Sequence, residues 1–331
     1  MKLKLIDTWN DPYSTDFPSQ AVFDGTYLYV VTAATNTGRI QKIDPATMAT
    51  VDSKTWSEST DWDGHYIWLS GSYIYSIDNY DMTLIRKIST STLAGVWLSL
   101  AGPGSFMGLD CGTSDGSVLY CGWGTASGTV AKITKVNNTT GATISTWTGI
   151  VDQDRSVNDI LWDGSYIYAV TTHNTKSKCY LHKIDISTMT TSSSVALPGG
   201  TYPYSMAGNT DYIYMPDQTT KVVFKIRKSV MAVVATSGII NGLPVGITVL
   251  NNKVFINYDD AVGRTLWCSM LNGNTLAVED TFKSGVPSWT LTPSMTNDGT
   301  FIYCGTENSG PGIGQIYKFA IAASGGFVQI I

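Results

Sequence analysis

Charged side chains are scarce in this chain of 331 residues. Asp, Glu, Lys and Arg together make up 14% of it, against about 25% in a typical soluble domain. The net charge is −5, so the chain lacks the basic field that attracts nucleic acid or an anionic membrane. No run of residues reaches the roughly 20 apolar positions that a membrane-spanning helix needs. We therefore expect neither nucleic-acid binding nor membrane insertion.

Histidine and cysteine are also few, which limits the chemistry available. The three histidines, His65, His173 and His182, are too few and too scattered for a zinc-ligand set or a Ser-His-Asp arrangement. The five cysteines are an odd number without CxxC spacing. We expect buried free thiols, with a Cys111–Cys121 bridge across one hairpin as the alternative. Without a phosphate loop, dinucleotide fingerprint or HExxH motif, the sequence predicts no cofactor and favours a protein that is not an enzyme.

The first residues lack the apolar segment of a secretory signal. Met1 to Asp7 include two lysines and an aspartate, whereas a signal peptide continues into an uninterrupted apolar region. Either no signal is needed or it was removed before residue 1, and we expect the first.

A repeat, in contrast, runs along the whole chain. Seven times a short turn, Asp-Gly in most copies, precedes a triplet of aromatic and aliphatic residues, and the triplets begin at residues 27, 66, 118, 166, 212, 254 and 301. The spacings of 39 to 52 residues are typical of β-propeller blades. Asp-Gly between alternating segments predicts a type I′ hairpin, because both central residues of that turn take positive φ.

Each repeat reads as four strands. The triplet continues as a second strand that is apolar on both faces, as expected for a sheet packed between two others. Third strands are predicted at residues 40–44, 74–78, 181–185 and 223–227, and a fourth strand at residues 142–147. No segment has a sustained amphipathic helical period. The prediction is one all-β domain over residues 1–331, a seven-bladed β-propeller of four-stranded antiparallel blades centred near residues 28, 67, 119, 167, 213, 255 and 302.

Closure of the ring has two candidates. Residues 327–331 have the composition of a fourth strand for the last blade, and residues 2–6 stand where a fourth strand would precede the first blade. One of them can complete the last sheet, which leaves the other free to add to a sheet edge or to a partner.

Two segments carry a family resemblance. Residues 42–48, Lys-Ile-Asp-Pro-Ala-Thr-Met, and residues 24–30, Asp-Gly-Thr-Tyr-Leu-Tyr-Val, resemble the repeats of the YVTN and NHL-like propellers, in which an IDPxT strand-turn alternates with a DGxxxYV hairpin. The signatures of WD40 and kelch repeats are absent. The resemblance implies a propeller and says almost nothing about activity, since the superfamily includes enzymes, scaffolds and ligand binders.

The predicted first strands, which would line the axis, carry few charges. Only Asp61, Asp110 and Asp159 contribute carboxylates there. Three carboxylates at one rim could bind Ca²⁺, which prefers oxygen ligands. Alternatively, they accept backbone hydrogen bonds or contact water.

The loops between second and third strands, and those between blades, open on one face, which we call the long-loop face. The opposite face, the short-turn face, carries mostly tight turns. Because binding usually resides in variable loops on a rigid scaffold, we select binding candidates on the long-loop face. These are Trp97, Trp123, Trp289, Asn174, Asp259, Asp260, Glu307 and Asn308. Exposed aromatic planes beside amides and carboxylates suit a protein partner or a sugar, although the same tryptophans could instead fill gaps between blades.

The sequence combines a closed ring with few charges and many Thr, Ser, Tyr and Trp residues. This combination favours a component of a particle that assembles inside the cell and is released by lysis. Our first hypothesis is a non-enzymatic structural or attachment protein of a phage-like virion or similar extracellular particle, assembled in the cytoplasm. Its partners would be other structural proteins of that particle or a host-surface glycan. A carbohydrate-binding or glycan-acting propeller is the alternative, and a metal-dependent hydrolase or lactonase is the second alternative.

Overall fold

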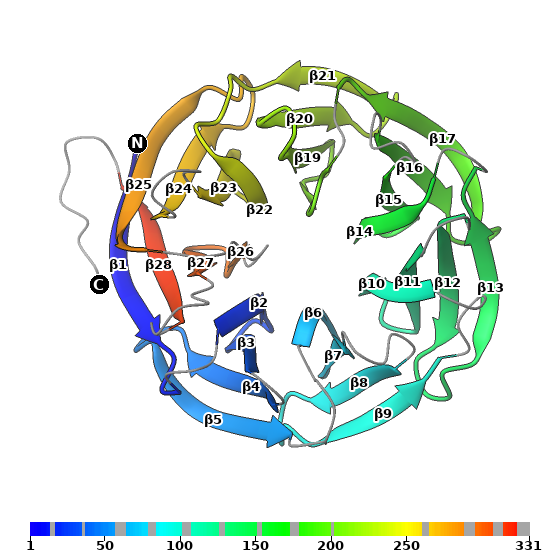
Figure 1. The fold of residues 1–331 in the computed structure, drawn as a ribbon, viewed down its shortest axis with the longest axis horizontal. Helices are drawn as coiled ribbons and strands as arrows, with labels where there is room; N and C mark the ends of the chain where they lie inside the picture. Colours follow the sequence, from blue (N-terminus) through cyan, green and yellow to red (C-terminus); the bar gives the residue numbers. More distant parts are fainter. Residues whose placement is uncertain are drawn as a thin grey trace.

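The computed structural model describes residues 1–13, 17–34, 37–56, 64–78, 84–100, 107–125, 130–150, 154–172, 179–199, 202–259, 265–287, 295–306 and 314–322. Within these residues all helices are absent, and 28 strands form seven four-stranded antiparallel sheets. The sheets stand around a common axis, each with its first strand innermost (Figure 1). The predicted seven-bladed β-propeller is confirmed.

Each blade runs from an innermost to an outermost strand, in the following order. Blade 1 is β2 (Phe17–Phe23), β3 (Leu28–Ala34), β4 (Thr37–Asp44) and β5 (Ala49–Trp56); blade 2 is β6 (Gly64–Ser70), β7 (Tyr73–Asp78), β8 (Leu84–Ser89) and β9 (Gly95–Ser99). Blade 3 is β10 (Met107–Ser114), β11 (Val118–Thr125), β12 (Lys132–Asn137) and β13 (Thr143–Thr148); blade 4 is β14 (Ser156–Trp162), β15 (Tyr166–Thr172), β16 (Cys179–Asp185) and β17 (Thr190–Leu197). Blade 5 is β18 (Ala207–Gly208), β19 (Tyr212–Asp217), β20 (Val222–Arg227) and β21 (Ala232–Thr236); blade 6 is β22 (Leu243–Leu250), β23 (Lys253–Asp259), β24 (Thr265–Asn272) and β25 (Val278–Pro287). Blade 7 is β26 (Met295–Asn297), β27 (Ile302–Thr306), β28 (Gln315–Ala322) and β1 (Lys2–Asn10).

The N-terminal strand closes the ring. β1 pairs antiparallel with β28 from Lys2 opposite Ala322 to Asn10 opposite Gln315, so the first residues of the chain are the outermost strand of the last blade (Figure 1). Trp9 anchors this strand: it is buried, and its indole N–H donates to Thr50 of blade 1 at 2.9 Å. Of the two closing segments proposed from the sequence, the N-terminal one forms the pairing. Residues 327–331 lie outside the described residues.

The described residues form seven apolar core clusters, and each lies between two neighbouring blades. Between blades 1 and 2, for example, Tyr29 and Ile40 pack with Ile74 and Ile88. This explains why the second strands are apolar on both faces, since each sheet is covered on both sides. All five cysteines are buried free thiols, as expected, and the alternative Cys111–Cys121 bridge does not form.

The Asp-Gly turns differ from the predicted type I′ geometry. Gly25 has a φ of 97°, but Asp24 is not in the positive-φ region. The Asp24 carboxylate instead accepts the N–H groups of Thr26 and Tyr27 at 2.8 and 2.7 Å, and the Tyr29 hydroxyl at 2.8 Å. Asp is therefore selected at this position as an acceptor inside the turn. Two successive residues with positive φ occur at Asn251 and Asn252 of blade 6.

The predicted strand assignment in blade 2 is wrong. The triplet that begins at Tyr66 lies on β6, the first strand, and residues 74–78 belong to the second strand β7 rather than the third. The turn between them is Gly71-Ser72, with Gly71 at a φ of 56°. Aromatic residues at alternate positions in both strands make the two segments resemble each other. With the triplet placed at Tyr73, the spacings on either side become 46 and 45 residues, close to those of the other blades.

A lysine on the third strand links each of several blades to the next. Its ammonium lies over an aromatic ring of its own blade, as Lys42 does 4.1 Å from the Tyr27 centroid. It also donates to a backbone carbonyl in the turn between the third and fourth strands of the following blade. These bonds join Lys42, Lys87, Lys135, Lys225 and Lys318 to Thr90, Asn138, Ile186, Gly273 and Pro45, at 3.0, 3.0, 3.0, 2.7 and 2.5 Å. We call this contact the lysine link.

Candidate functional site

The long-loop face is described only in part, and several predicted binding residues fall outside that part. Trp289, Asn174, Asp260, Glu307 and Asn308 all lie outside the described residues. Of the eight predicted binding residues, the structure therefore describes only Trp97, Trp123 and Asp259.

The three remaining candidates lie on strands. Trp97 is on the outermost strand β9, whereas it was selected as a residue of the loops on the long-loop face. Asp259 ends β23 and is half-buried. The prediction of an exposed ring at Trp123 is wrong, because Trp123 is 0% exposed and its indole N–H donates to Thr134 at 2.8 Å. Trp123 therefore fills the space between blades 2 and 3.

The described blade-to-blade connections of this face expose other apolar and aromatic side chains. Tyr13 and Tyr204 are each 39% exposed, Ile150 is 47% exposed and Ile239 is 81% exposed. The guanidinium of Arg39 lies 3.3 Å from the centroid of the Tyr13 ring. These four were missed from the sequence because tryptophan was given priority, although each stands in a linker between predicted strands.

Two of the three axial carboxylates, Asp110 and Asp159, belong to the described residues. Asp61 lies outside the described residues. Asp110 as a whole residue is exposed on β10, but its carboxylate lies against Gly124, and desolvation of this carboxylate raises its pKa to about 7. Within the described residues, no group of three or more His, Cys, Asp or Glu side chains is arranged to hold a metal ion.

Asp159 is buried and fully engaged. It accepts the Tyr66 hydroxyl of blade 2 at 2.6 Å, the backbone N–H of Ile160 at 2.8 Å and the backbone N–H of Met206, which precedes β18 of blade 5, at 2.5 Å. Burial raises the pKa of Asp159 to about 6, although these donors act in the opposite direction. The carboxylate thus connects three blades near the axis, which is the backbone-acceptor alternative proposed from the sequence.

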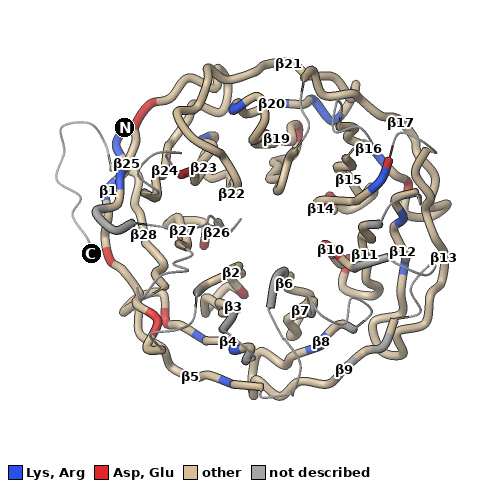
Figure 2. Tube along the Cα trace, viewed as in Figure 1, with Lys and Arg blue, Asp and Glu red and all other residues tan. Residues whose placement is uncertain are grey.

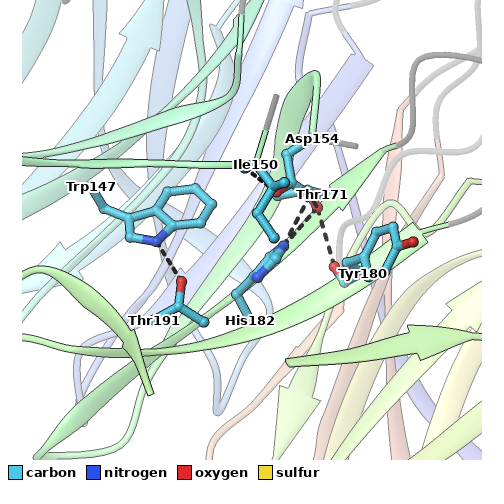
Figure 3. Close-up of polar contacts among 7 residues, drawn as sticks. All are labelled: Trp147, Ile150, Asp154, Thr171, Tyr180, His182 and Thr191. Atoms are coloured by element: carbon cyan, nitrogen blue, oxygen red, sulfur yellow. Dashed lines mark hydrogen bonds and ion pairs between the residues drawn. The ribbon is translucent and has the colours of Figure 1, made fainter. Parts of the chain in front are cut away.

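A buried His-Asp-Thr group lies at the junction of blades 3 and 4 (Figure 3). His182 Nε2 lies 2.9 Å from Asp154 Oδ1 and 3.3 Å from Thr171 Oγ1, and Thr171 Oγ1 donates to the same carboxylate oxygen. Burial would raise the pKa of Asp154, but the hydrogen bond and charge of His182, with the Thr171 and Ile150 donors, lower it. His182 is completely buried.

This group cannot work as a catalytic triad. A triad uses both ring nitrogens, one toward the nucleophile and one toward the carboxylate, whereas Thr171 and Asp154 both contact Nε2. Blade 1 repeats the arrangement with Gln41, whose amide donates to Asp11 at 2.9 Å. Because glutamine has no acid-base function, the shared position is structural. His182 is buried in this hydrogen-bond network, and its ring packs against those of Trp147 and Tyr180 at centroid distances of 5.2 and 6.1 Å.

The short-turn face is hollowed between blades 4 and 5. A cavity of about 480 Å³ opens there, and the residues around it include three cations, two acids and three tyrosines: Lys183, Arg227, Lys228, Asp163, Asp211, Tyr166, Tyr168 and Tyr212. This site was not predicted from the sequence, because the short-turn face was treated as uniform.

Comparison with known proteins supports the architecture alone. No protein-family model matches the chain, and no curated protein matches it. Among solved structures, the chain is similar to BamB from Moraxella catarrhalis, with a TM-score of 0.60 and 15% identity, over 96% of this chain and 100% of that chain. At this identity the similarity shows the fold and carries no activity with it.

Proposed function

We propose that this propeller is a non-enzymatic structural or attachment component of a phage-like virion or similar extracellular particle, and that it binds its partner through the long-loop face. The observation that carries the proposal is the exposure of Tyr13, Ile150, Tyr204 and Ile239 at four blade-to-blade connections of that face. Exposed apolar and aromatic side chains at several junctions of one face can serve as anchors of a protein interface.

The rim of the ring supports contact with neighbouring structural proteins. The outermost strands of blades 2 to 5, β9, β13, β17 and β21, contain no charged residue, whereas β1, β5 and β25 do (Figure 2). Charges on an exposed edge strand discourage pairing with another chain. The uncharged arc formed by β9, β13, β17 and β21 is therefore suited to lie against another protein.

The resemblance of residues 24–30 and 42–48 also leads us to propose kinship with the YVTN and NHL-like propellers. The metal-dependent hydrolase or lactonase has less support. The carboxylate of Asp159 is occupied by three donors of the chain itself, so it is poorly placed to bind Ca²⁺. The described residues contain no helix that is both long and apolar enough to cross a membrane.

The test is whether the chain is built into particles. Mass spectrometry of density-purified particles from cells that express it should find the chain at a fixed ratio to the other structural proteins. The double variant Ile239→Lys with Tyr204→Ser should lower incorporation at least tenfold. Val230→Lys is the matched control, because Val230 is 63% exposed in a turn of the short-turn face, and this variant should incorporate normally. Absence of the chain from particles would overturn the proposal.

A further inference from the structure

The hollow between blades 4 and 5 arises where the lysine link is interrupted. Lys183 occupies the same third-strand position as the linking lysines and lies 4.0 Å from the centroid of the Tyr166 ring. Within the described residues, however, its ammonium has no hydrogen-bond or ion-pair partner, whereas five other blades give theirs a backbone carbonyl. An ammonium has three N–H donors, so Lys183 retains the capacity to bind an acceptor in the hollow.

The turn of blade 5 departs from the repeat at the same place. In four other blades the first turn residue is Asp or Asn, and its side chain accepts a backbone N–H two residues later. These residues are Asp44, Asn137, Asp185 and Asn272. Blade 5 has Arg227, which has no acceptor and cannot make this bond. The favourable turn residue is thus replaced by a cation, and local departures of this kind are expected at functional sites.

The neighbouring cation, Lys228, is already paired. Its ammonium lies 3.4 Å from Asp163 Oδ2, and the Lys228 side chain is 9% exposed. Asp163 also accepts the N–H groups of its own turn, at Ser165 and Tyr166. The charge of Asp163 is therefore matched by Lys228, so Lys183 and Arg227 are the two cations left to serve a ligand. Arg227 is exposed, and its guanidinium is 3.4 Å from the Tyr212 hydroxyl.

The other groups around the hollow are suited to hydroxyl groups. Asp211, Ser165, Thr210 and Ser229 line it, and they offer acceptors and donors beside the two cations. The volume of about 480 Å³ lies within the range of small-molecule sites and exceeds what a bare inorganic anion fills. Arginine binds carboxylates through two parallel N–H bonds.

We propose that this hollow binds a carboxylate-bearing sugar residue, with the carboxylate at Lys183 and Arg227 and the sugar hydroxyls at the surrounding polar groups. The site lies on the short-turn face, opposite the surface used in the proposed function. It therefore does not depend on that function, and either can fail while the other stands.

The test is titration calorimetry on the full chain with four probes. They are methyl β-glucuronide, the methyl glycoside of N-acetylneuraminic acid, the neutral methyl β-glucoside, and inorganic phosphate. At least one acidic sugar should bind at least tenfold more tightly than the glucoside and the phosphate. Its affinity should fall as salt is raised, because the site is open to solvent.

Variants locate the site. Arg227→Asp restores the acceptor of the other blades and should fold normally, and Lys183→Met removes the ammonium while keeping an unbranched side chain of similar length. Each should weaken binding of the acidic sugar at least tenfold. Lys42→Met changes the same repeat position in blade 1, away from the hollow, and should leave binding unchanged.

Three results would overturn the proposal. The first is no binding of either acidic sugar at about 10 mM, a concentration at which a site with a Kd of about 1 mM would be mostly occupied. The second is phosphate binding as strong as that of the acidic sugar, which would indicate an anion site without sugar recognition. The third is unchanged binding in both Arg227→Asp and Lys183→Met, because binding would then occur elsewhere. Melting temperatures show that each variant is folded.

Discussion

We call the packing interface between two neighbouring blades a seam. The seam between blades 1 and 2 and the seam between blades 4 and 5 are built from equivalent residues of the repeat but are connected by different polar contacts. In the first, Lys42 lies over Tyr27 and donates to the Thr90 carbonyl at 3.0 Å, which joins the two blades at the short-turn face. In the second, Lys183 has the equivalent ring contact but, among the described residues, no such bond, and Lys228 reaches back to Asp163 instead.

The second seam is secured nearer the axis. Asp159 of blade 4 accepts the backbone N–H of Met206, which precedes the first strand of blade 5. At this seam a buried carboxylate therefore makes the hydrogen bond between blades that a lysine makes at five other seams. The repeat therefore determines the positions of the strands, whereas the polar contacts that connect neighbouring blades differ from one seam to the next. A seam held at one edge can remain open at the other, and this leaves room for a ligand.

Removal of nearly all of strand β1, which closes the ring, should have the largest effect on stability. Deleting residues 1–9 exposes β28 and removes Trp9, which contacts Thr50 of blade 1. We expect the melting temperature to fall by about 10 °C or more, since each kcal/mol corresponds to a few degrees in a chain of this size. Calorimetry measures this. Lys4→Ser, an exposed position on the same strand, should change little, and a deletion with the same small effect would contradict the closure by β1.

Asp159→Ala should be the most damaging single substitution at the second seam. It leaves the buried donors of Tyr66, Ile160 and Met206 without their acceptor, which costs about 3–5 kcal/mol. Urea unfolding measures the loss. Asp110→Ala is the matched control on the neighbouring first strand and should cost less than about 1 kcal/mol, because Asp110 is exposed. Equal losses in the two variants would mean that the seam is not secured by Asp159.

The same carboxylate should give the seam a pH dependence. The pKa of Asp159 is raised from 3.8 to about 6 in the folded protein, so the folded state binds this proton more tightly than the unfolded state. Its contribution is full below about pH 4 and is lost as the pH rises to about 6, by up to about 3 kcal/mol. The difference in unfolding free energy between the wild type and Asp159→Asn should therefore change over this window. A constant difference between pH 4 and 7 would refute the assignment.

The lysine link itself should show the contrast between the seams most directly. Lys42→Met loses the bond to Thr90 and the cation over Tyr27, which should lower the free energy of unfolding by about 1–2 kcal/mol. Lys183→Met loses a ring contact only and should stay within about 0.5 kcal/mol of the wild type. Urea unfolding of the pair tests this, and a larger loss for Lys183→Met would reverse the comparison.

Arg227→Asp should have the smallest effect, and in the stabilising direction. An aspartate at this position can accept the backbone N–H of Ser229, as Asp185 accepts that of Ser187 at 2.7 Å. We expect the melting temperature to rise by about 2 °C, equivalent to one net hydrogen bond. Differential scanning calorimetry measures the shift. A clear fall would show that Arg227 stabilises the turn through contacts with its neighbours.

The sequence predicts the ring well because the repeated residues are those that form the turns and the buried strands. Asp24 and Gly25 are needed by the turn itself, and second-strand residues such as Leu28 are needed by the packing of sheets. The strands of blade 2 were assigned one position too late because Tyr66 and Tyr73 begin similar apolar segments on adjacent strands. Local pattern cannot tell a first strand from a second when both carry aliphatic residues on one face and aromatic residues on the other.

The candidate sites were less predictable, because they depend on what a side chain reaches. Trp123 stands beside a predicted loop, yet its ring turns inward to Thr134. The lysines of the third strand were visible as a recurring residue, but their partners lie in another blade about 50 residues away in the chain. Only the three-dimensional arrangement of the seams shows that Lys183 lacks such a partner among the described residues.

The pairing of Lys2 with Ala322 has a consequence for biosynthesis. Lys2 and Ala322 are 320 positions apart, so β1 must wait until β28 has been synthesised before its hydrogen-bonding partner exists. Contacts between such distant positions form slowly, and an early strand with free N–H and C=O groups is prone to improper association during that wait. Productive folding therefore depends on keeping β1 unpaired until β28 has been synthesised.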